Sequence, residues 1–263
     1  MLPKAKKSLG QNFLVDKNIL NKIISITKIT NKNILEIGPG TGSLTEFILK
    51  KEPKNLTVIE KDEFLCEKLK SKFNGNIIII NNDVLKEDIK KIEKNEKFTV
   101  FGNLPYNIST EIICNWVLNL KNNCWFDELI LMFQKEVADR IIAKENTSNF
   151  GRLSILLNWR LNINKIFDIY PNSFFPRPKI DSTVLHMTPK VNFEKFNNPK
   201  NIEIVTRIFF NQRRKMIKHP IRQLFKNSEK ISKKLNLNLN LRPQNLSSKQ
   251  FYDIIYEYEK LRN

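Results

Sequence analysis

Three successive junctions between a predicted strand and a predicted helix are the feature that most limits how this 263-residue chain can fold. The strands are predicted at residues 33–37, 56–59 and 77–80, because each is a short apolar run followed by apolar residues at helical spacing. The third run consists of four isoleucines, which predicts a parallel strand that is buried on both faces. This alternation predicts an α/β fold with helices on both faces of a parallel sheet.

Each of these predicted strands ends in residues that suit a nucleotide pocket. Gly38, Gly40 and Gly42 follow the first strand, where glycine lets the backbone approach a ligand and leaves helix N–H groups facing it. Glu60 ends the second strand and is placed to accept both ribose hydroxyls of an adenosine. Asp83 follows the third strand and could accept from an adenine amino group. The alternatives are a tight turn without a ligand for the glycines and a helix cap for Asp83.

The segment Asn103-Leu104-Pro105-Tyr106 specifies chemistry more narrowly, and it follows a fourth predicted strand at residues 98–101. Asn103 offers an amide oxygen as an acceptor, and Pro105 favours an extended Leu104 that can aim its carbonyl outward. Tyr106 supplies a flat face on which a base can stack. Alone, these residues could form an ordinary turn. Together with the three junctions, they predict one pocket for an adenosine.

Lysine and arginine outnumber aspartate and glutamate by 45 to 27, a net charge of +18, which predicts a polyanionic partner, with nucleic acid favoured over a membrane. More than half of this excess lies after residue 190, where helical patterns continue without a further convincing strand. We therefore expect a sheet domain at residues 1–189 and a small, basic helical domain at 190–263. The candidate contacts with the phosphates of such a nucleic acid are Lys4, Lys6, Lys7, Arg177, Lys179, Arg213, Arg214, Lys215 and Lys218. A solvated helical face is the alternative for the last four.

Several classes of protein are disfavoured by the same composition. Cys66, Cys114 and Cys124 are too few and too scattered for a disulfide framework, and we expect no metal site. The amino terminus lacks an apolar signal core, and no run approaches the ~20 apolar residues that a membrane helix needs. A cytoplasmic, thiol-reducing location is therefore the default expectation.

Five motifs in order make the chain resemble the rRNA adenine N6-dimethyltransferases, and most of all the group that modifies small-subunit rRNA. The resemblance spans nearly the whole chain and implies a Rossmann-like methyltransferase domain, a small helical domain and S-adenosylmethionine as methyl donor. The positions that it matches to donor binding are Asn12, Leu14, Gly38, Glu60, Asp83 and Asn103, beside Gly40 of the glycine turn. The motifs lie at residues 8–14, 36–42, 103–109, 174–182 and 211–215.

The resemblance also implies a substrate and a mechanism. The substrate would be two adjacent adenines in the hairpin loop near the 3′ end of small-subunit rRNA, each methylated twice, within a pre-assembled subunit. Asn103 and the Leu104 carbonyl would accept from the adenine amine, while Tyr106 and Phe174 would stack on the base. No general base is required, because positioning matters more than proton transfer for an activated methyl group. Nothing in the sequence demands more than a monomer.

Three alternatives remain to be weighed. The large-subunit rRNA adenine methyltransferases share the chemistry, but they tend to carry isoleucine at the position of Leu104, which favours the small-subunit group. A non-catalytic assembly or transcription factor of the same fold would be expected to have lost Glu60 or the Asn103 motif, and both are present. A nicotinamide dehydrogenase would need the spacing G-x-G-x-x-G, which the glycine turn lacks.

Overall fold

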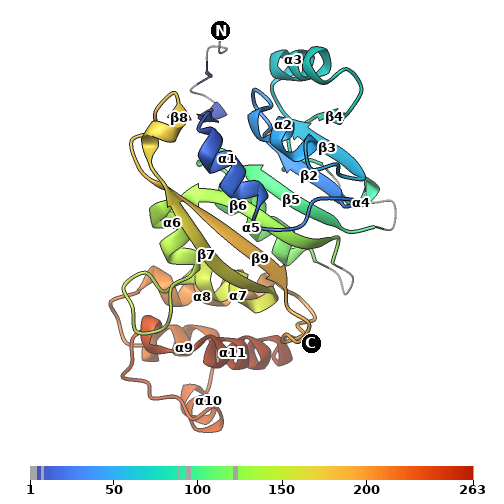
Figure 1. Cartoon of the computed structure of the whole chain (residues 1–263). Helices are drawn as coiled ribbons and strands as arrows, with labels where there is room; N and C mark the ends of the chain where they lie inside the picture. The colour runs from blue at the N-terminus through green and yellow to red at the C-terminus, as the bar shows by residue number, and fades with distance from the viewer. Residues whose placement is uncertain (1–4, 7–8, 88, 93–95, 121–123, 263) are drawn as a thin grey trace. The chain divides into compact units, whose positions relative to one another are not determined.

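A seven-stranded sheet organises the first part of the computed structural model, which describes residues 5–6, 9–87, 89–92, 96–120 and 124–262. The strand order is β4-β3-β2-β5-β6-β9-β7 (Figure 1). Along this order, each pair of neighbouring strands from β4 through β3, β2 and β5 to β6 is parallel, and β9 runs antiparallel to β6. The strands are β2 (Asn33–Ile37), β3 (Asn55–Glu60), β4 (Ile78–Asn81), β5 (Phe98–Asn103), β6 (Phe126–Gln134), β7 (Leu161–Ile169) and β9 (Ser182–Pro189).

Helices alternate with the parallel strands, so the predicted α/β fold is confirmed. The glycine turn after β2 leads directly into its helix, because Gly42 occupies the N-cap position with φ of 74°. Asp62 caps the next helix by accepting from the Phe64 N–H at 3.1 Å. The helices are α1 (Lys17–Ile24), α2 (Ser43–Leu49), α3 (Glu63–Phe73), α4 (Ile89–Ile92), α5 (Ser109–Leu118) and α6 (Lys135–Ile141).

Apolar side chains cover both faces of the sheet. One buried cluster joins α1 (Ile23), α2 (Ile48) and α3 (Leu69) to strand residues such as Val58 and Phe101. Leu35 and Val100, which stand next to the cluster residues Ile34 and Phe101 along their strands, are also fully buried but lie outside this cluster, because successive residues of a strand point to opposite faces. Burial on both faces leaves the strand ends as the open part of the sheet, and this is where a ligand can enter.

The last three of the four isoleucines begin the parallel strand β4 as predicted, but the prediction that the run is buried is wrong for these three; only Ile77, just before the strand, is buried. β4 is the last strand at its edge of the sheet, with β3 as its strand neighbour. The side chain of Ile78 is 55% exposed, and the other β4 residues are partly or fully exposed. An apolar run therefore identified the strand but not its position in the sheet.

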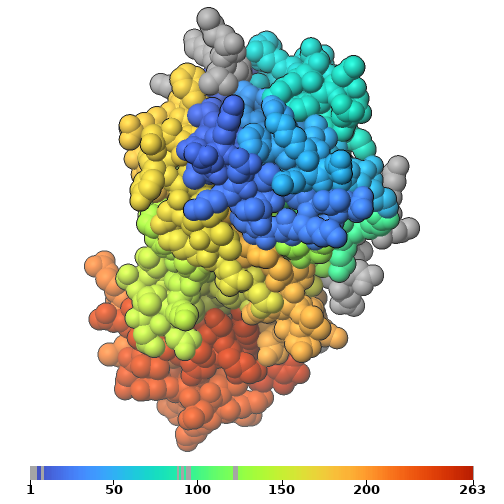
Figure 2. Space-filling model, in the orientation of Figure 1, coloured from blue at the N-terminus to red at the C-terminus, as the bar shows by residue number. Residues whose placement is uncertain are grey.

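Two pieces of β-structure were missing from the sequence prediction. β7 (Leu161–Ile169) lies at the opposite edge of the sheet, and most of its residues are partly or fully exposed, with only the first and the last buried. A separate two-stranded sheet pairs β1 (Phe13–Leu14) with β8 (Phe174–Phe175) in antiparallel orientation. In the space-filling view, the blue residues near the amino terminus accordingly lie beside the yellow residues around β8 (Figure 2).

The second compact unit is mostly helical and includes all the residues after Pro189. Its core includes an edge-to-face contact between Phe209 and Phe251, with ring centroids 5.2 Å apart. The unit combines residues 116–119 and 139–161 with 190–263, while the first unit holds the remaining residues up to Pro189. The predicted division into domains 1–189 and 190–263 stays a prediction. The helices of this part are α7 (Arg152–Arg160), α8 (Lys200–Asn211), α9 (Lys218–Leu224), α10 (Ser228–Lys234) and α11 (Ser248–Lys260).

Among the residues that the structure describes, no helix is long and apolar enough to cross a membrane. No group of three or more histidine, cysteine, aspartate and glutamate side chains in this part of the chain could hold a metal ion.

Candidate active site

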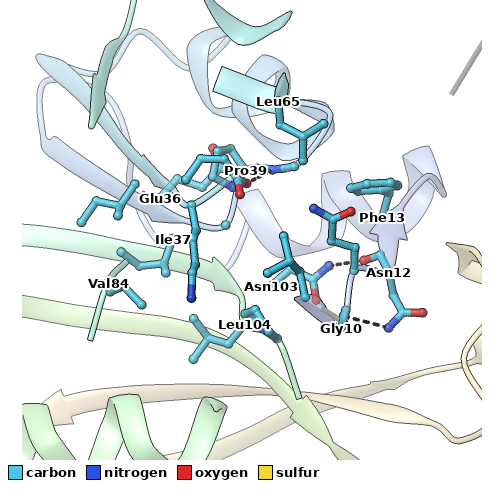
Figure 3. Close-up of a pocket in the computed structure, with 18 of the residues that line it drawn as sticks. Gly10, Asn12, Phe13, Glu36, Ile37, Pro39, Leu65, Val84, Asn103 and Leu104 are labelled. Atoms are coloured by element: carbon cyan, nitrogen blue, oxygen red, sulfur yellow. Dashed lines mark hydrogen bonds between the residues drawn. The ribbon is translucent and has the colours of Figure 1, made fainter. Parts of the chain in front are cut away.

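A cavity of about 310 Å³ opens at the carboxyl ends of the central strands (Figure 3). It lies where the order of strands reverses: β3 and β4 extend from one side of β2, and the chain returns to form β5 on the other side. Ligands of open α/β sheets bind at this point, and the volume lies at the lower end of the range for small-molecule sites. The lining comes from residues 9–14, the turn after β2, the end of β3, the turn after β4 and the loop after β5.

All the residues predicted to bind the methyl donor line this one cavity. They come from separate elements, and the sheet brings them together, which is the arrangement that a nucleotide-like ligand requires. The apolar side chains that share the lining, among them Leu65 and Val84, suit a flat base (Figure 3). The predicted residues in the lining are Asn12, Leu14, Gly38, Gly40, Glu60, Asp83 and Asn103.

Glu60 is a buried carboxylate that backbone groups hold in place. Its side chain accepts from the Gly40 N–H at 3.1 Å and from the Asp62 N–H at 2.9 Å. Burial raises the pKa of Glu60, and these backbone hydrogen bonds oppose the shift without cancelling it. The turn after β2 and the end of β3 are therefore fixed to each other before any ligand arrives.

The glycine turn is shaped by the protein's own packing as well as by the needs of a ligand. Gly40 has φ of 58°, and a Cβ at this position would lie 2.8 Å from the Phe13 ring. Gly38 has φ of 66°, and its Cβ would lie 3.4 Å from the backbone oxygen of Asn103. The missing side chain of Gly40 thus lets the amino-terminal residues close around the turn, whereas Gly38 is favoured there by its positive φ.

Asp83 lines the cavity but also serves as a turn residue. One carboxylate oxygen accepts from the Leu85 N–H at 3.0 Å, and the other accepts from Lys61 Nζ at 2.8 Å. The hydrogen bond from Lys61 lowers the pKa of Asp83, with burial acting in the opposite direction. The helix cap that was the alternative for this residue is not what the structure shows: Asp83 holds a turn before α4 begins at Ile89, beside its place in the cavity.

The position of the Asn103 amide is set by a contact with the amino-terminal residues. Asn103 Nδ2 donates to the backbone oxygen of Asn12 at 2.7 Å (Figure 3). Because a backbone carbonyl can only accept, the amide nitrogen must face Asn12, and the amide oxygen is left to accept from another group. Leu104 and Pro105 also line the cavity, and the Leu104 side chain is buried.

The two aromatic residues predicted to stack on a base lie in different surroundings. Tyr106 lines the cavity, and its hydroxyl is 2.5 Å from Ser182 Oγ at the start of β9. Burial raises the pKa of this phenol, with Ser182 acting in the opposite direction. Phe174, by contrast, is only 4% exposed, belongs to the buried core cluster and is not part of the cavity lining. The adjacent Phe175 is 49% exposed, so the sequence could not tell which ring faces outward.

Glu36 also lines the cavity, although the sequence analysis gave it no role. It is 2% exposed and accepts from the Thr45 hydroxyl at 2.7 Å. Burial raises the pKa of Glu36 to about 8, and the nearby Glu60 carboxylate acts in the same direction. The signals in the sequence were an acidic residue inside an otherwise apolar strand and its place at the start of the motif at residues 36–42.

The predicted RNA-binding cations of the first unit fall into three groups. Lys4 and Lys7 lie outside the described residues. Lys6 makes an ion pair with Asp62, with Nζ 2.8 Å from the carboxylate, so it contributes to the structure. Arg177 and Lys179 are exposed in the loop after β8 and remain candidates for RNA contact.

In the second unit, the cluster after α8 divides in a similar way. The Arg213 guanidinium donates to the backbone oxygens of Ser148 and, at 3.0 Å, Phe150, and so holds the loop before α7. Arg214, Lys215 and Lys218 are exposed. Position in the cluster alone could not separate the arginine that binds a loop from the cations that face solvent.

Comparisons with known proteins agree with this geometry. A model of the ribosomal RNA adenine dimethylase family matches residues 2–260. The ribosomal RNA small subunit methyltransferase A of Pelagibacter ubique is 60% identical over 262 residues, which is all of both chains. The protein of the same name from Ehrlichia ruminantium is 42% identical over 255 residues, 95% of each chain. The chain belongs to the ribosomal RNA adenine dimethylase family.

Solved structures show how far the fold of this family extends. A dimethyladenosine transferase from Plasmodium falciparum is 25% identical, with a TM-score of 0.80 over 94% of this chain and 98% of that one. The 23S rRNA methyltransferase ErmE has a TM-score of 0.68 over 94% of this chain and 99% of its own, and at 21% identity it shows the fold alone. The predicted fold, that of the class I S-adenosylmethionine-dependent methyltransferases, is confirmed.

The buried Glu36 predicts a pH dependence of stability. Its pKa is about 8 in the folded chain and near 4.5 when exposed, so the folded state binds the extra proton between these values. The contribution of Glu36 to the free energy of unfolding is fully present below about pH 4.5. It is lost as the pH rises toward 8, by up to roughly 1.4 kcal/mol per pH unit. Urea unfolding across this window should show a steeper decline for the wild type than for Glu36→Gln, which keeps an acceptor for Thr45. Parallel curves would contradict the buried, proton-binding Glu36.

The divided basic cluster predicts that neighbouring arginines have different effects. Arg213→Gln should destabilise the fold by about 1 kcal/mol, because the Ser148 and Phe150 carbonyls lose their charged donor. Arg214→Gln and Lys215→Gln should leave the melting temperature nearly unchanged, weaken RNA binding and each reduce the slope of log affinity against log salt by about 1. Thermal melts and RNA titrations at several salt concentrations measure both effects. An unchanged salt slope would mean that Arg214 and Lys215 form only a solvated face.

Proposed function

We propose that this protein transfers methyl groups from S-adenosylmethionine to N6 of two adjacent adenines in the 3′-terminal hairpin loop of small-subunit rRNA. The observation that carries this proposal is that one cavity joins the predicted donor-binding residues to the loop Asn103-Leu104-Pro105-Tyr106. The family, and relatives named for the small ribosomal subunit, support the choice of RNA.

The residues of the cavity fit the proposed donor. In this proposal Glu60 accepts from the ribose hydroxyls of the donor, and Asp83 accepts from its adenine amine. The other parts of the donor are contacted by Asn12, Leu14, Gly38 and Gly40. The buried carboxylate and the open backbone of the glycine turn are the features that an adenosine needs. When bound, S-adenosylmethionine would supply an electrophilic methyl group. The residues of the chain then need only hold the acceptor nitrogen in line with it.

Asn103 would make the adenine amine a better nucleophile. The lone pair of N6 is delocalised into the ring, so the free amine reacts poorly. Hydrogen bonds from its N–H groups to the Asn103 amide oxygen and the Leu104 carbonyl would favour the geometry that directs the lone pair out of the ring system. The contact from Asn12 supports this role, because it leaves the amide oxygen as the available end. Catalysis by positioning of this kind requires no general base.

The target base would have to leave its stack to reach this loop. Tyr106 would then stack on it, and the hydroxyl contact with Ser182 would hold the phenol ring in place. Phe174 could take part only if its ring leaves the core. The pocket must also leave room for one methyl group, since each adenine is modified twice.

The proposed partner is small-subunit rRNA within a pre-assembled small subunit, bound by a monomer in the cytoplasm. The net charge of +18 supports a polyanionic partner. Arg177, Lys179, Arg214, Lys215 and Lys218 are exposed and are the proposed phosphate contacts. For Lys6 and Arg213, structural contacts compete with this role.

Methyl incorporation tests the function directly. Unmethylated small subunits and large-subunit rRNA should be incubated in parallel with labelled S-adenosylmethionine, and the modified bases mapped. Dimethyladenine confined to the small-subunit 3′ hairpin is the expected result. Label in the large-subunit RNA would reverse the choice of substrate. Absence of label from both RNAs, with the donor still bound, would point to a non-catalytic assembly factor.

Asn103→Ala should reduce methyl transfer by about 10²-fold or more, because the acceptor amine loses its positioning group. Donor binding should weaken far less, since the other lining residues remain. Single-turnover methylation and calorimetric titration with S-adenosylhomocysteine measure the two effects separately. Asn76→Ala, which truncates an exposed asparagine of the same unit, is the matched control. Activity of Asn103→Ala near that of the control would refute the proposed mechanism.

A further inference from the structure

We propose that Asp62 is a positioning residue that holds the N-terminal arm over the cavity and so fixes the orientation of the Asn103 amide. The N-terminal arm is defined here as the described residues 5–6 and 9–14. Asp62 does not line the cavity, and no sequence motif singled it out. The consequence for catalysis rests on the proposed function, whereas the contact between Asp62 and the arm does not.

The side chain of Asp62 accepts hydrogen bonds from two residues of the arm, which are also bonded to each other. Its side chain is 2% exposed. One carboxylate oxygen accepts from Lys6 Nζ at 2.8 Å, and the other accepts from Gln11 Nε2 at 3.1 Å. Gln11 Oε1 in turn accepts from the Lys6 backbone N–H at 2.7 Å. The carboxylate, the ammonium and the amide thus satisfy one another, and they join the arm to the turn after β3.

Holding Gln11 in place also restrains the next residue of the arm, which contacts the proposed acceptor site. Asn12 follows Gln11, and the Asn12 carbonyl accepts from Asn103 Nδ2 at 2.7 Å. An arm that lifts away would release this bond, and the Asn103 side chain could then rotate so that its nitrogen faced the substrate amine. Two donors would face each other, which disfavours the geometry needed for transfer.

The two ends of the arm are held in different ways. Its carboxyl-terminal end, Phe13–Leu14, pairs with β8, and the Val15 N–H donates to the Ser173 oxygen at 2.9 Å. At the other end, the contacts of Lys6 and Gln11 with Asp62 tie the arm to the turn after β3. The backbone N–H of Asp62 also donates to Glu60 at 2.9 Å. One residue therefore connects the arm to the acid that is proposed to hold the donor ribose.

Asp62 also caps α3, and a substitution can separate the two roles. The cap needs a single oxygen, which accepts from the Phe64 N–H. Asparagine keeps such an oxygen and is an equally good cap, but it loses the negative charge that attracts Lys6, which bonds to the same oxygen as the Phe64 N–H. It also loses the second acceptor oxygen, which Gln11 uses. Burial alone would raise the pKa of Asp62, yet the bonds from Lys6 and Gln11 bring it below its usual value. The group that Asp62→Asn removes is therefore a charged carboxylate at neutral pH.

The experiment compares Asp62→Asn and Gln11→Ala with Glu63→Gln. The control removes an acidic side chain one residue away that is exposed. Hydrogen exchange of residues 9–14 in the free protein reports on the arm, S-adenosylhomocysteine titration reports on the donor site, and single-turnover methylation of small subunits reports on catalysis. We expect both arm variants to exchange at least about tenfold faster in the arm, to bind S-adenosylhomocysteine about tenfold more weakly and to have a lower single-turnover rate of methyl transfer. The melting temperature of Asp62→Asn should stay close to that of Glu63→Gln, because the cap is kept.

Each outcome supports or overturns the inference. Arm exchange and donor affinity in Asp62→Asn and Gln11→Ala equal to those of Glu63→Gln would refute it and leave Asp62 as a helix cap only. A lower melting temperature with unaltered arm exchange would do the same. If wild-type protein methylates no RNA but the arm variants still release the arm and lose donor affinity, the proposed function fails while the role of Asp62 stands.

Discussion

The reversal of strand order beside β2 is the constraint on which the site depends. The strands β2, β3 and β5 are parallel neighbours, so their carboxyl ends meet at one edge of the sheet. The turns after these strands must therefore share one space, whatever their separation in the sequence. Burial of both faces of the sheet leaves this edge as the place where polar groups can face a ligand.

The N-terminal arm completes what the strand ends begin. The sheet supplies a carboxylate, an open backbone and an amide, but it leaves the amide free to turn. The Asn12 carbonyl removes that freedom, and the missing Cβ of Gly40 gives Phe13 the room to bring the arm close. The chemistry proposed for this protein thus uses the loop that begins at Asn103, and the geometry of that residue is set by a contact about 90 positions away in the sequence.

The sequence predicted those features that local pattern and spacing determine. The strand–helix alternation and the helical C-terminal part are confirmed, and every residue predicted to bind the donor lies in one cavity. Features that depend on distant contacts were not predictable: the exposure of Ile78 at the sheet edge, the burial of Phe174 instead of Phe175, and the use of Lys6 and Arg213 in structural bonds. A lysine bound to a buried carboxylate and a lysine facing solvent look the same in a sequence.

The hydrogen bond from Asn103 to Asn12 has a consequence for the choice between bases. With its nitrogen engaged by a backbone carbonyl, the side chain presents an oxygen, and in the proposed site the Leu104 carbonyl would present another. Two acceptors side by side match an exocyclic amino group and repel the keto oxygen that guanine carries at the same ring position. A site whose polar groups are fixed in this way discriminates far more strongly than one that relies on shape. The arm would thus make the proposed site selective for amino purines over keto purines.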